Sequence, residues 1–435
     1  MESGKETANV YRNREFRIYL ATRFLMTFGI QMQNVITGWY LYELTKDPLI
    51  LGMVGLSEAL PALSSALFAG DLVDKFDKRK VLIIAFSVYL VCGIGFTFLG
   101  TQYAASLSHQ LVVWGFYGIS MLLGLARAFA TPASFSILSY LFPLEMLPKA
   151  APASSTAWQV GAILGPATGG FVYALTDAPS SSFVVCLFML SSVILASFLS
   201  PKPPYEEKKR EEQSRRQRIS EGIRYVFSNK VILSAITLDL FAVLFGGATA
   251  ILPAFASEIL HVGAVELGWL RAAPSVGSAI LLFLLSIRPP ESKSGIKLLL
   301  AVTGFGLCMI AFSLSTNLWL SIFFLFASGA FDAVSVVIRS TILQIYTPDH
   351  MRGRVSAVNT MFVGSSNEIG AFESGTAARL LGTAPSVLIG GSITLLVVAL
   401  VARFAPTLRK FELNTIKLRE ERVLTTNSSK SIKHL

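Results

Sequence analysis

Long apolar runs dominate the chain, and short polar breaks separate them. A helix of roughly 20 apolar residues crosses a bilayer, so these runs predict about twelve membrane-spanning helices. The expected spans cover residues 17–43, 48–74, 79–100, 109–138, 147–174, 180–199, 230–258, 265–287, 296–315, 318–346, 352–379 and 384–405. Several contain Gly or Pro, which membrane helices tolerate. We therefore expect an all-α integral membrane protein.

A polar stretch in the middle of the chain divides six expected spans from six. Within it, Glu211 precedes Arg215 by four residues, the spacing of a helical ion pair. Further on, a single helix face collects the apolar residues Ile219, Ile223, Val226 and Phe227, as in a helix on a membrane surface. The stretch is interpreted as a linker, with a regulatory or partner site as the alternative. The expected organisation is an N-terminal arm (1–16), a first six-helix bundle (17–200), the linker with its amphipathic helix (201–229), a second six-helix bundle (230–405) and a tail (406–435).

The two halves of the chain resemble each other. A shift of 205 positions pairs Gly124 with Gly329, Pro143 with Pro348, Met146 with Met351, Gly165 with Gly370 and Gly170 with Gly375. The same shift sets Arg127 opposite Asp332. Duplicated halves around a central site are how many secondary transporters are built. The repeat predicts two pseudo-symmetric bundles of six helices.

Composition supports the membrane interpretation and excludes several classes. Hydrophobic residues make up 53% and charged residues 15%, whereas a soluble globular protein carries about 25% charged residues. This argues against a water-soluble enzyme, a secreted disulfide scaffold and a disordered chain. The three cysteines are isolated and belong to no CxxC or Cys/His cluster, so we expect no metal and no cofactor. The polar first sixteen residues do not resemble a cleavable signal peptide.

The basic residues predict the orientation in the membrane. If the N-terminus is cytoplasmic, 31 Lys and Arg residues fall in cytoplasmic segments and two, Lys46 and Arg379, fall outside. Cytoplasmic loops of membrane proteins carry such an excess. We expect both termini in the cytoplasm. The net charge of +10 is then explained by basic loops, without a nucleic-acid partner.

The loop after the second span carries a recognisable motif. It reads Gly70-Asp-Leu-Val-Asp74-Lys75-Phe-Asp77-Lys-Arg79-Lys. In this loop the chain resembles the major facilitator superfamily, whose signature is roughly G-x-L-a-D-r-x-g-r-r, although Asp77 stands where the family usually has glycine. We expect Gly70 to let two helices approach closely and Asp74 to cap a helix N-terminus, with Lys75 and Arg79 in a basic cluster. An ordinary basic loop is the alternative.

The fifth span contains a second motif. Gly161, Gly165 and Gly169 recur every four residues and form a smooth helix face, while Pro166 bends the helix and Gly170 completes the pattern. The segment is similar to the G-x-x-x-G-P-x-x-G-G motif of the superfamily's antiporters, chiefly drug exporters. Simple helix packing is the alternative explanation.

Further segments narrow the resemblance, over about residues 23–403. They include Gly38–Thr45, Asp239–Gly247, Leu270–Pro274, Gly329–Ser335, Arg352–Ala357 and Gly370–Gly375. Together they resemble the branch that holds enterobactin exporters and macrolide efflux proteins. The resemblance implies a monomer in the bacterial inner membrane that exports amphipathic organic molecules, drug- or siderophore-like, in exchange for protons. Import, lipid flipping through the same fold and a non-transporting membrane sensor are the alternatives.

Charged residues inside the spans are the candidate coupling groups. A charge near the bilayer centre costs about 2.5–3.5 kcal/mol, so such residues tend to face a cavity or a partner. The candidates are Asp239, Asp332, Glu58, Glu373, Arg127 and Arg271. An acid that moves between an apolar setting and an Arg neighbour could load and release a proton. The alternative for each acid is a static ion pair, for example of Arg127 or Arg339 with Asp332. No role is expected for Arg339 or Arg23, which lie near the cytoplasmic side.

Aromatic residues make up 11% of the chain. Five of them are candidates for the wall of a cargo cavity: Trp39, Tyr42, Phe241, Phe245 and Trp269. Interfacial or lipid-facing positions are the alternative for each. The chain has no P-loop GxxxxGK[ST], no HExxH and no GxSxG, so the residues for common ATP-driven or hydrolytic chemistry are missing and no enzyme is expected. The expected partners are a small molecule, protons and the lipid bilayer.

Overall fold

The computed structural model describes residues 10–143, 146–203, 215–288, 292–348 and 351–412. Twelve long helices stand side by side within this part of the chain. The first half contributes α1 (Arg14–Thr45), α2 (Pro48–Lys75), α3 (Lys78–Leu99), α5 (His109–Leu141), α6 (Leu147–Leu175) and α7 (Ala178–Ser197). The second half contributes α9 (Lys230–Gly246), α11 (Ala264–Ile287), α12 (Ser294–Ser313), α13 (Leu318–Tyr346), α14 (Arg352–Leu381) and α15 (Thr383–Phe404).

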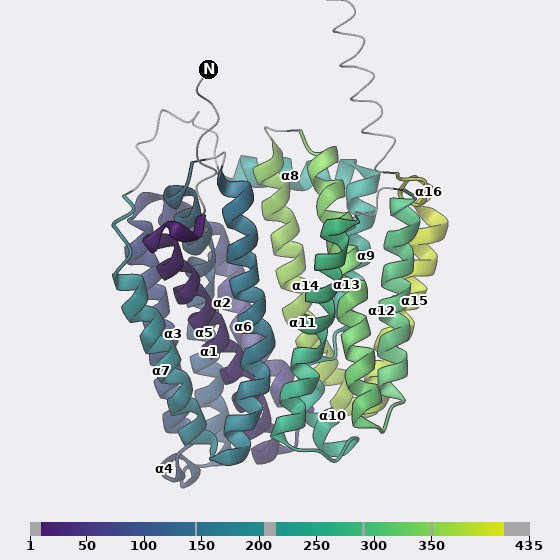
Figure 1. Ribbon diagram of the computed structural model, residues 1–435. Coiled ribbons are helices and arrows are strands. Elements are labelled where there is room, and N and C mark those ends of the chain that lie inside the picture. Colours follow the sequence, from purple (N-terminus) through teal and green to yellow (C-terminus); the bar gives the residue numbers. More distant parts are fainter. Residues whose placement is uncertain (1–9, 144–145, 204–214, 289–291, 349–350, 413–435) are drawn as a thin grey trace, which may run out of the picture.

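Short helices complete the described structure. They are η1 (Val10–Arg12), α4 (Gln102–Ala105), α8 (Arg215–Ser228), η3 (Thr249–Ile251), α10 (Leu252–Glu258) and α16 (Pro406–Arg409). Figure 1 shows α8 and α16 at the end of the molecule where α1 begins and α15 ends, and α4 and α10 at the other end. We call these ends the terminal face and the opposite face.

The expected spans correspond to the observed helices within a few residues, but one of them is not a single continuous helix. The span expected at 230–258 is broken: α9 stops at Gly246, and η3 and α10 follow after the Gly246-Gly247 pair. Glycine weakens a helix interior, and Pro253 cannot supply a helical backbone donor. The chain therefore turns at this level and begins a new helix.

Polar caps explain where many helices begin. Asp47, Asp77, Asp177, Asn229 and Asn317 each accept a backbone N–H of the helix that follows, which satisfies donors that the helix itself leaves unpaired. Asp177 lies in the turn before α7, and hydrogen bonds from Ser180 hold the pKa of its carboxyl below the usual value.

Nine helical segments in the described residues are long and apolar enough to cross a membrane by length and composition, and one of them, Lys230–Glu258, comprises α9, η3 and α10. The other three long helices, α1, α6 and α14, are more polar, and all three contact the opposite half of the molecule. Helices that face a protein partner or a cavity need not be apolar all round. These three helices lie on the boundary between the halves, together with α2 and α11.

The pseudo-symmetry of the halves is visible in the helix contacts. A side chain on Gly124 of α5 would collide with the Glu58 carbonyl of α2, and one on Gly329 of α13 would collide with the Pro274 carbonyl of α11. These two glycines are 205 positions apart. Each half therefore packs its fourth span on its second span, with the backbones in contact at equivalent positions.

The apolar cores show where the halves are joined. One cluster, around Phe16, Tyr19 and Met26, contains residues of the first half, and a second, around Ile232, Ile338 and Val355, contains residues of the second half. Two other clusters mix the halves: Val35 and Trp39 of α1 pack with α10 and α11, and Ala254 of α10 packs with α1, α2, α3 and α5. The mixed clusters lie toward the opposite face.

Glycines bring the two halves into backbone contact in the same region. A Cβ on Gly52 of α2 would lie 2.8 Å from the Ala371 carbonyl oxygen of α14, and a Cβ on Gly268 of α11 would lie 2.6 Å from the Pro166 carbonyl oxygen of α6. We call these two lines of contact, α2 with α14 and α6 with α11, the glycine seams. At these glycines the backbone of one half lies directly against the other half.

Gly165 of α6 offers a direct test of tight packing within the first half. A Cβ there would lie 2.7 Å from the Gln31 Cβ and 2.8 Å from the Phe28 carbonyl oxygen of α1. Overpacking of this kind costs about 1–3 kcal/mol or more. We expect Gly165→Leu to lower the thermal unfolding midpoint in detergent. Gly118→Leu is the control, because no atom lies within 4 Å of a Cβ at Gly118; equal melting of the two variants would contradict the packing role.

Candidate functional site

Three charged side chains meet at mid-height on the boundary between the halves. Arg127 of α5 lies 3.0 Å from a carboxylate oxygen of Glu58 on α2, and donates a 2.6 Å hydrogen bond to Glu368 on α14. Arg127 and Glu58 belong to the first half, whereas Glu368 belongs to the second. We call these three residues the bridging triad. It contains two carboxylates and one guanidinium.

Glu368 is absent from the sequence-derived candidates, although it lies inside the expected span 352–379. The available signal was an acidic residue inside an expected span, although its neighbours Ser365, Ser366 and Asn367 are polar. The alternative of a static ion pair of Asp332 with Arg127 or Arg339 is wrong in its partners, because Arg127 pairs with Glu58 and Glu368 and Arg339 pairs with Asp239.

A cavity of about 160 Å³ adjoins the triad. Its lining comes from both halves and includes Glu58, Ser120, Asn34, Thr37 and Arg271, together with apolar side chains from α1, α2, α3 and α5. Asn34 is exposed although it lies well inside α1. The space is therefore open enough to solvate polar groups between the halves.

A second pair of charges lies wholly within the second half. Asp239 of α9 forms an ion pair with Arg339 of α13, and both are at least 94% buried, with 5% and 6% of their surfaces exposed. Asp332 lies two helical turns before Arg339 on α13. Together with Asp239 it lines a cavity of about 10 Å³, which is close to the space that one water needs. Arg339, for which no role was expected, therefore neutralises a buried acid.

The remaining charged candidates lie apart from the triad. Glu373 is five residues beyond Glu368 on α14 and is partly buried, but it is not among the residues that line these two cavities. Arg271 of α11 lines the larger cavity, where its Nη2 donates to the Thr249 carbonyl over 3.4 Å.

The five aromatic candidates do not line the larger cavity; Phe96 is the aromatic residue among its lining. Trp39 and Tyr42 are buried in the mixed cores, at 7% and 1% exposure. Phe241 and Phe245 stack on each other along α9, with ring centroids 6.1 Å apart. Trp269 is 39% exposed and stacks on the exposed Trp319, as expected for an outward-facing aromatic pair.

Polar contacts close the molecule at the opposite face. Tyr42 of α1 donates to Glu258 of α10, whose second oxygen accepts a 2.5 Å hydrogen bond from Thr383. Arg379 of α14 lies 3.2 Å from Asp47, the cap of α2. These contacts join the first half to the second, so they would have to break before the halves could separate at this end.

The glycines of the fifth-span motif divide between two partners. A Cβ on Gly161, Gly165 or Gly169 would press on α1, whereas one on Gly170 would collide with the Ala264 carbonyl of α11. Pro166 supplies the carbonyl that Gly268 of α11 packs against. The motif therefore packs α6 against its own half and against the other half at once.

The loop motif after α2 behaves differently from the expectation. Among the described residues, no atom lies within 4 Å of a Cβ on Gly70, so Gly70 mediates no close helix approach in this part of the structure. Asp74 is exposed, and the cap of α3 comes from Asp77. Lys75 is exposed, and Arg79 donates to the Ser197 carbonyl at the end of α7.

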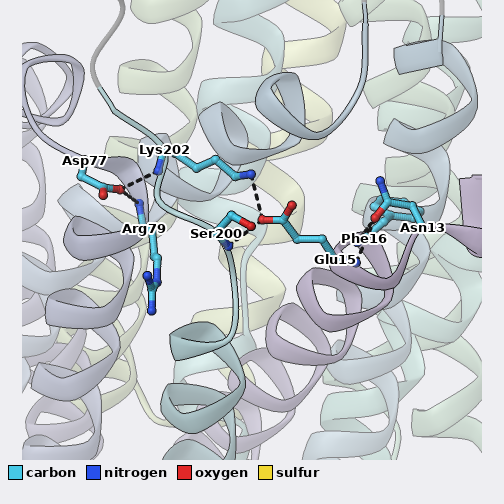
Figure 2. Close-up of polar contacts among 7 residues, drawn as sticks. All are labelled: Asn13, Glu15, Phe16, Asp77, Arg79, Ser200 and Lys202. Carbon is cyan, nitrogen blue, oxygen red and sulfur yellow. Dashed lines mark hydrogen bonds and ion pairs between the residues drawn. The ribbon is translucent and has the colours of Figure 1, made fainter.

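Asp77 also anchors the chain that leaves α7. Its Oδ1 accepts from the backbone N–H of Arg79 at 2.9 Å and from that of Lys202 at 3.0 Å (Figure 2). The Lys202 ammonium in turn lies 2.8 Å from Glu15 near the start of α1 (Figure 2). A glycine at position 77 could make neither contact. The departure from the family signature is thus explained by a clasp that joins the starts of α1 and α3 to the linker.

The expected linker is described in part. Residues 204–214, which include Glu211, lie outside the described residues, as do 1–9 of the arm, 413–435 of the tail and the side chain of Ile219. Val226 of α8 is buried in the core of the second half, and Glu221 pairs with Arg354 of α14. Ile223 and Phe227 are 40% and 57% exposed, so α8 presents an apolar edge at the terminal face.

A match to a protein-family model over almost the whole chain identifies the family. The model described as "Transmembrane secretion effector", a family of major facilitator proteins, matches residues 7–426. The chain belongs to the major facilitator superfamily. It is a membrane transporter and not an enzyme.

Curated relatives of this transporter share about a quarter of its residues. The enterobactin exporter EntS of Shigella boydii serotype 4 (strain Sb227) is 23% identical, over 90% of this chain and 94% of that protein. The enterobactin exporter EntS of Citrobacter koseri is 24% identical, over 91% of this chain and 93% of that protein.

Solved transporters share its fold. A mutant of the nucleoside transporter NupG aligns with a TM-score of 0.71 at 13% identity, covering 90% of this chain and 100% of that one. A D-xylose-proton symporter aligns with a TM-score of 0.69 at 14% identity, covering 88% and 96%. This likeness supports two pseudo-symmetric six-helix bundles.

The buried pair in the second half predicts a strong effect on stability. Asp239→Asn would leave the Arg339 guanidinium buried without a counter-charge, and breaking such a pair costs about 3–5 kcal/mol. We expect a lower thermal unfolding midpoint for Asp239→Asn, with most of the loss recovered in the double variant Asp239→Asn, Arg339→Gln. A double variant no more stable than the single one would show that the uncompensated charge is not the cause.

The clasp at Asp77 predicts a smaller effect. Asp77→Ala removes the helix cap and the acceptor for Lys202, and loss of a cap costs about 0.5–2 kcal/mol. We expect a correspondingly lower free energy of unfolding in a denaturant titration. Asp77→Asn keeps a side-chain carbonyl oxygen and should retain most of the stability. Identical losses in both variants would contradict capping.

Proposed function

We propose that this transporter exports amphipathic organic molecules, drug- or siderophore-like, in exchange for protons by alternating access. The observation that carries the proposal is the bridging triad, in which two carboxylates from different halves meet one guanidinium. The enterobactin exporters among its relatives support an organic cargo and the outward direction.

The charge of the triad provides a proton site. One guanidinium compensates one carboxylate, so a second ionised carboxylate would leave a net negative charge in the membrane interior. Such a charge is costly, and a bound proton removes it. Burial favours the neutral form of an acid, whereas a nearby cation favours the ionised form. The charge balance at Glu58 and Glu368 therefore depends on whether both contact Arg127.

The position of the triad couples this proton to movement. Glu368 belongs to α14, while Arg127 belongs to α5 in the other half. A rocking motion that parts the halves at this level would separate Glu368 from Arg127, so the charge balance of the triad would change with each reorientation. Asp239 and Asp332, by contrast, both lie in the second half, and a rigid rotation of that half would leave their surroundings unchanged.

The proposed orientation places the terminal face in the cytoplasm of a bacterial cell, with the protein as a monomer in the inner membrane. The excess of basic residues at that face supports it. The mixed cores and the contacts of Glu258 and Asp47 close the opposite face. We infer that the structure represents a state in which cargo enters from the cytoplasm.

Transport in everted membrane vesicles tests the proposal. Everted vesicles with an imposed pH gradient would be offered a panel of siderophores, macrolides and cationic dyes. Gradient-dependent accumulation of a panel member inside the vesicles is expected. Movement in the other direction would indicate import, lipid movement alone would indicate a flippase, and binding without flux would indicate a sensor.

The triad predicts which acid couples transport to protons. We expect Glu368→Gln to fold but to lose most gradient-driven flux, at least ten-fold, while exchange of cargo down its own gradient persists. Glu58→Gln should behave similarly, because it also removes the second carboxylate. Glu412→Gln is the control, since Glu412 is exposed beyond the last span. Full gradient-driven flux in both triad variants would overturn the assignment.

A further inference from the structure

Arg271 differs from the other arginines deep in the helices. Arg127 pairs with Glu58 and Glu368, and Arg339 pairs with Asp239. Among the described residues, no carboxylate forms an ion pair with Arg271. Its Nη2 makes one long hydrogen bond of 3.4 Å to the Thr249 carbonyl, and its buried Nε has no hydrogen-bond partner.

The position of Arg271 places this cation at the cavity between the halves. Arg271 begins the third turn of α11, on the side of the opposite face, and lines the cavity of about 160 Å³. Its guanidinium reaches the first half: a Cβ built on Gly38 of α1 would lie 3.2 Å from Nη2. The absence of a side chain at Gly38 leaves room for it.

The other residues that line the cavity indicate which chemical groups a bound anion could carry. Asn34, Thr37 and Ser120 supply polar groups, while Leu41, Leu51, Val54, Phe96 and Leu123 supply apolar surface. Glu58 is the acid in the lining, and Arg127 already faces it at 3.0 Å. The cavity therefore combines one uncommitted cation with an aliphatic and aromatic wall.

We propose that Arg271 binds a carboxylate, or a similar oxyanion, of an amphipathic cargo whose apolar body rests on the leucine-rich wall. A guanidinium suits this role because its planar donors match a carboxylate bidentately. The proposal rests on the proposed function only in that the cargo enters this cavity. A bound anion would touch Arg271 of the second half and the α1 wall of the first, so it also bridges the halves.

A pair of probes that differ only in charge tests this binding. N-dansyl-L-phenylalanine is an aromatic carboxylate, and its carboxamide is the neutral counterpart. Binding to the purified full-length protein in detergent would be followed by dansyl fluorescence anisotropy, without any gradient. We expect the wild type to bind the carboxylate about ten-fold more tightly than the amide, as one charge-assisted hydrogen bond would provide.

Variants assign the preference to Arg271. Arg271→Gln should bind both probes equally, and Arg271→Lys should keep a reduced preference for the carboxylate. Arg288→Gln is the matched control, because Arg288 is exposed at the other end of α11. Gly38→Ala leaves the arginine present but crowds Nη2, so it should weaken carboxylate binding several-fold and spare the amide. The Gly38→Ala variant therefore tests whether Arg271 binds the carboxylate even if Arg271→Gln does not fold.

The proposal is overturned if the wild type binds neither probe or binds both equally, or if Arg271→Gln or Gly38→Ala keeps the full preference for the carboxylate. Because the assay needs no proton gradient, its outcome is separate from that of the transport experiment. If the wild type shows no charge preference but transports with the proton gradient, the anion site is disproved and proton exchange stands. If it shows the preference but no gradient-driven flux, proton exchange is disproved and the anion site stands.

Discussion

The cost of holding charge within a membrane organises the interior of this transporter. An ionised side chain near the bilayer centre must meet a counter-charge, water or a ligand. Arg339 meets Asp239 within one half, and Arg127 meets carboxylates from both halves. The first arrangement is self-contained and stabilises a bundle. The second depends on how the bundles are placed, so the same physical rule produces a structural pair in one place and a movable one in another.

The distribution of apolar cores agrees with this division. Each half has a core of its own, and the halves share cores toward the opposite face. Tyr42 and Asp47 add polar contacts across the boundary there. Two bundles that each have a core of their own and share a limited boundary can reorient relative to each other without unfolding. A change in the shared contacts leaves the two separate cores intact.

Sequence patterns foretold the helices because each span carries its own signals, a long apolar run and often a capping residue such as Asn317. The break after Gly246 could have been predicted from the sequence, because Gly246 and Gly247 are adjacent and Pro253 follows shortly after them. Partners across helices were harder. Arg127 and Asp332 occupy equivalent positions in the two halves, and equivalence by pseudo-symmetry is not contact. The true partner, Glu368, depends on which helices are neighbours, which periodicity along one helix does not reveal.

The motif residues show the same limit. Spacing identified the small-residue face of Gly161, Gly165 and Gly169, because a recurrence of four is a property of a single helix. It misplaced the roles of Gly70 and Asp74, whose surroundings belong to other segments. Asp77, noticed as a departure from the family signature, contacts a linker residue 125 positions away.

The glycine seams have a consequence for the speed of the conformational cycle. Along them, a Cβ on Gly52, Gly268 or Gly375 would lie 2.8, 2.6 or 2.8 Å from a backbone carbonyl oxygen of the neighbouring helix. At these points few side-chain rotamers have to rearrange when the halves move. The side chains that do cross the boundary, such as Gln159 on the Ser275 carbonyl and Arg127 on Glu368, would supply more of the resistance to movement. The dwell time in each state would then be governed by the electrostatic latch at mid-height and by the occupant of the cavity.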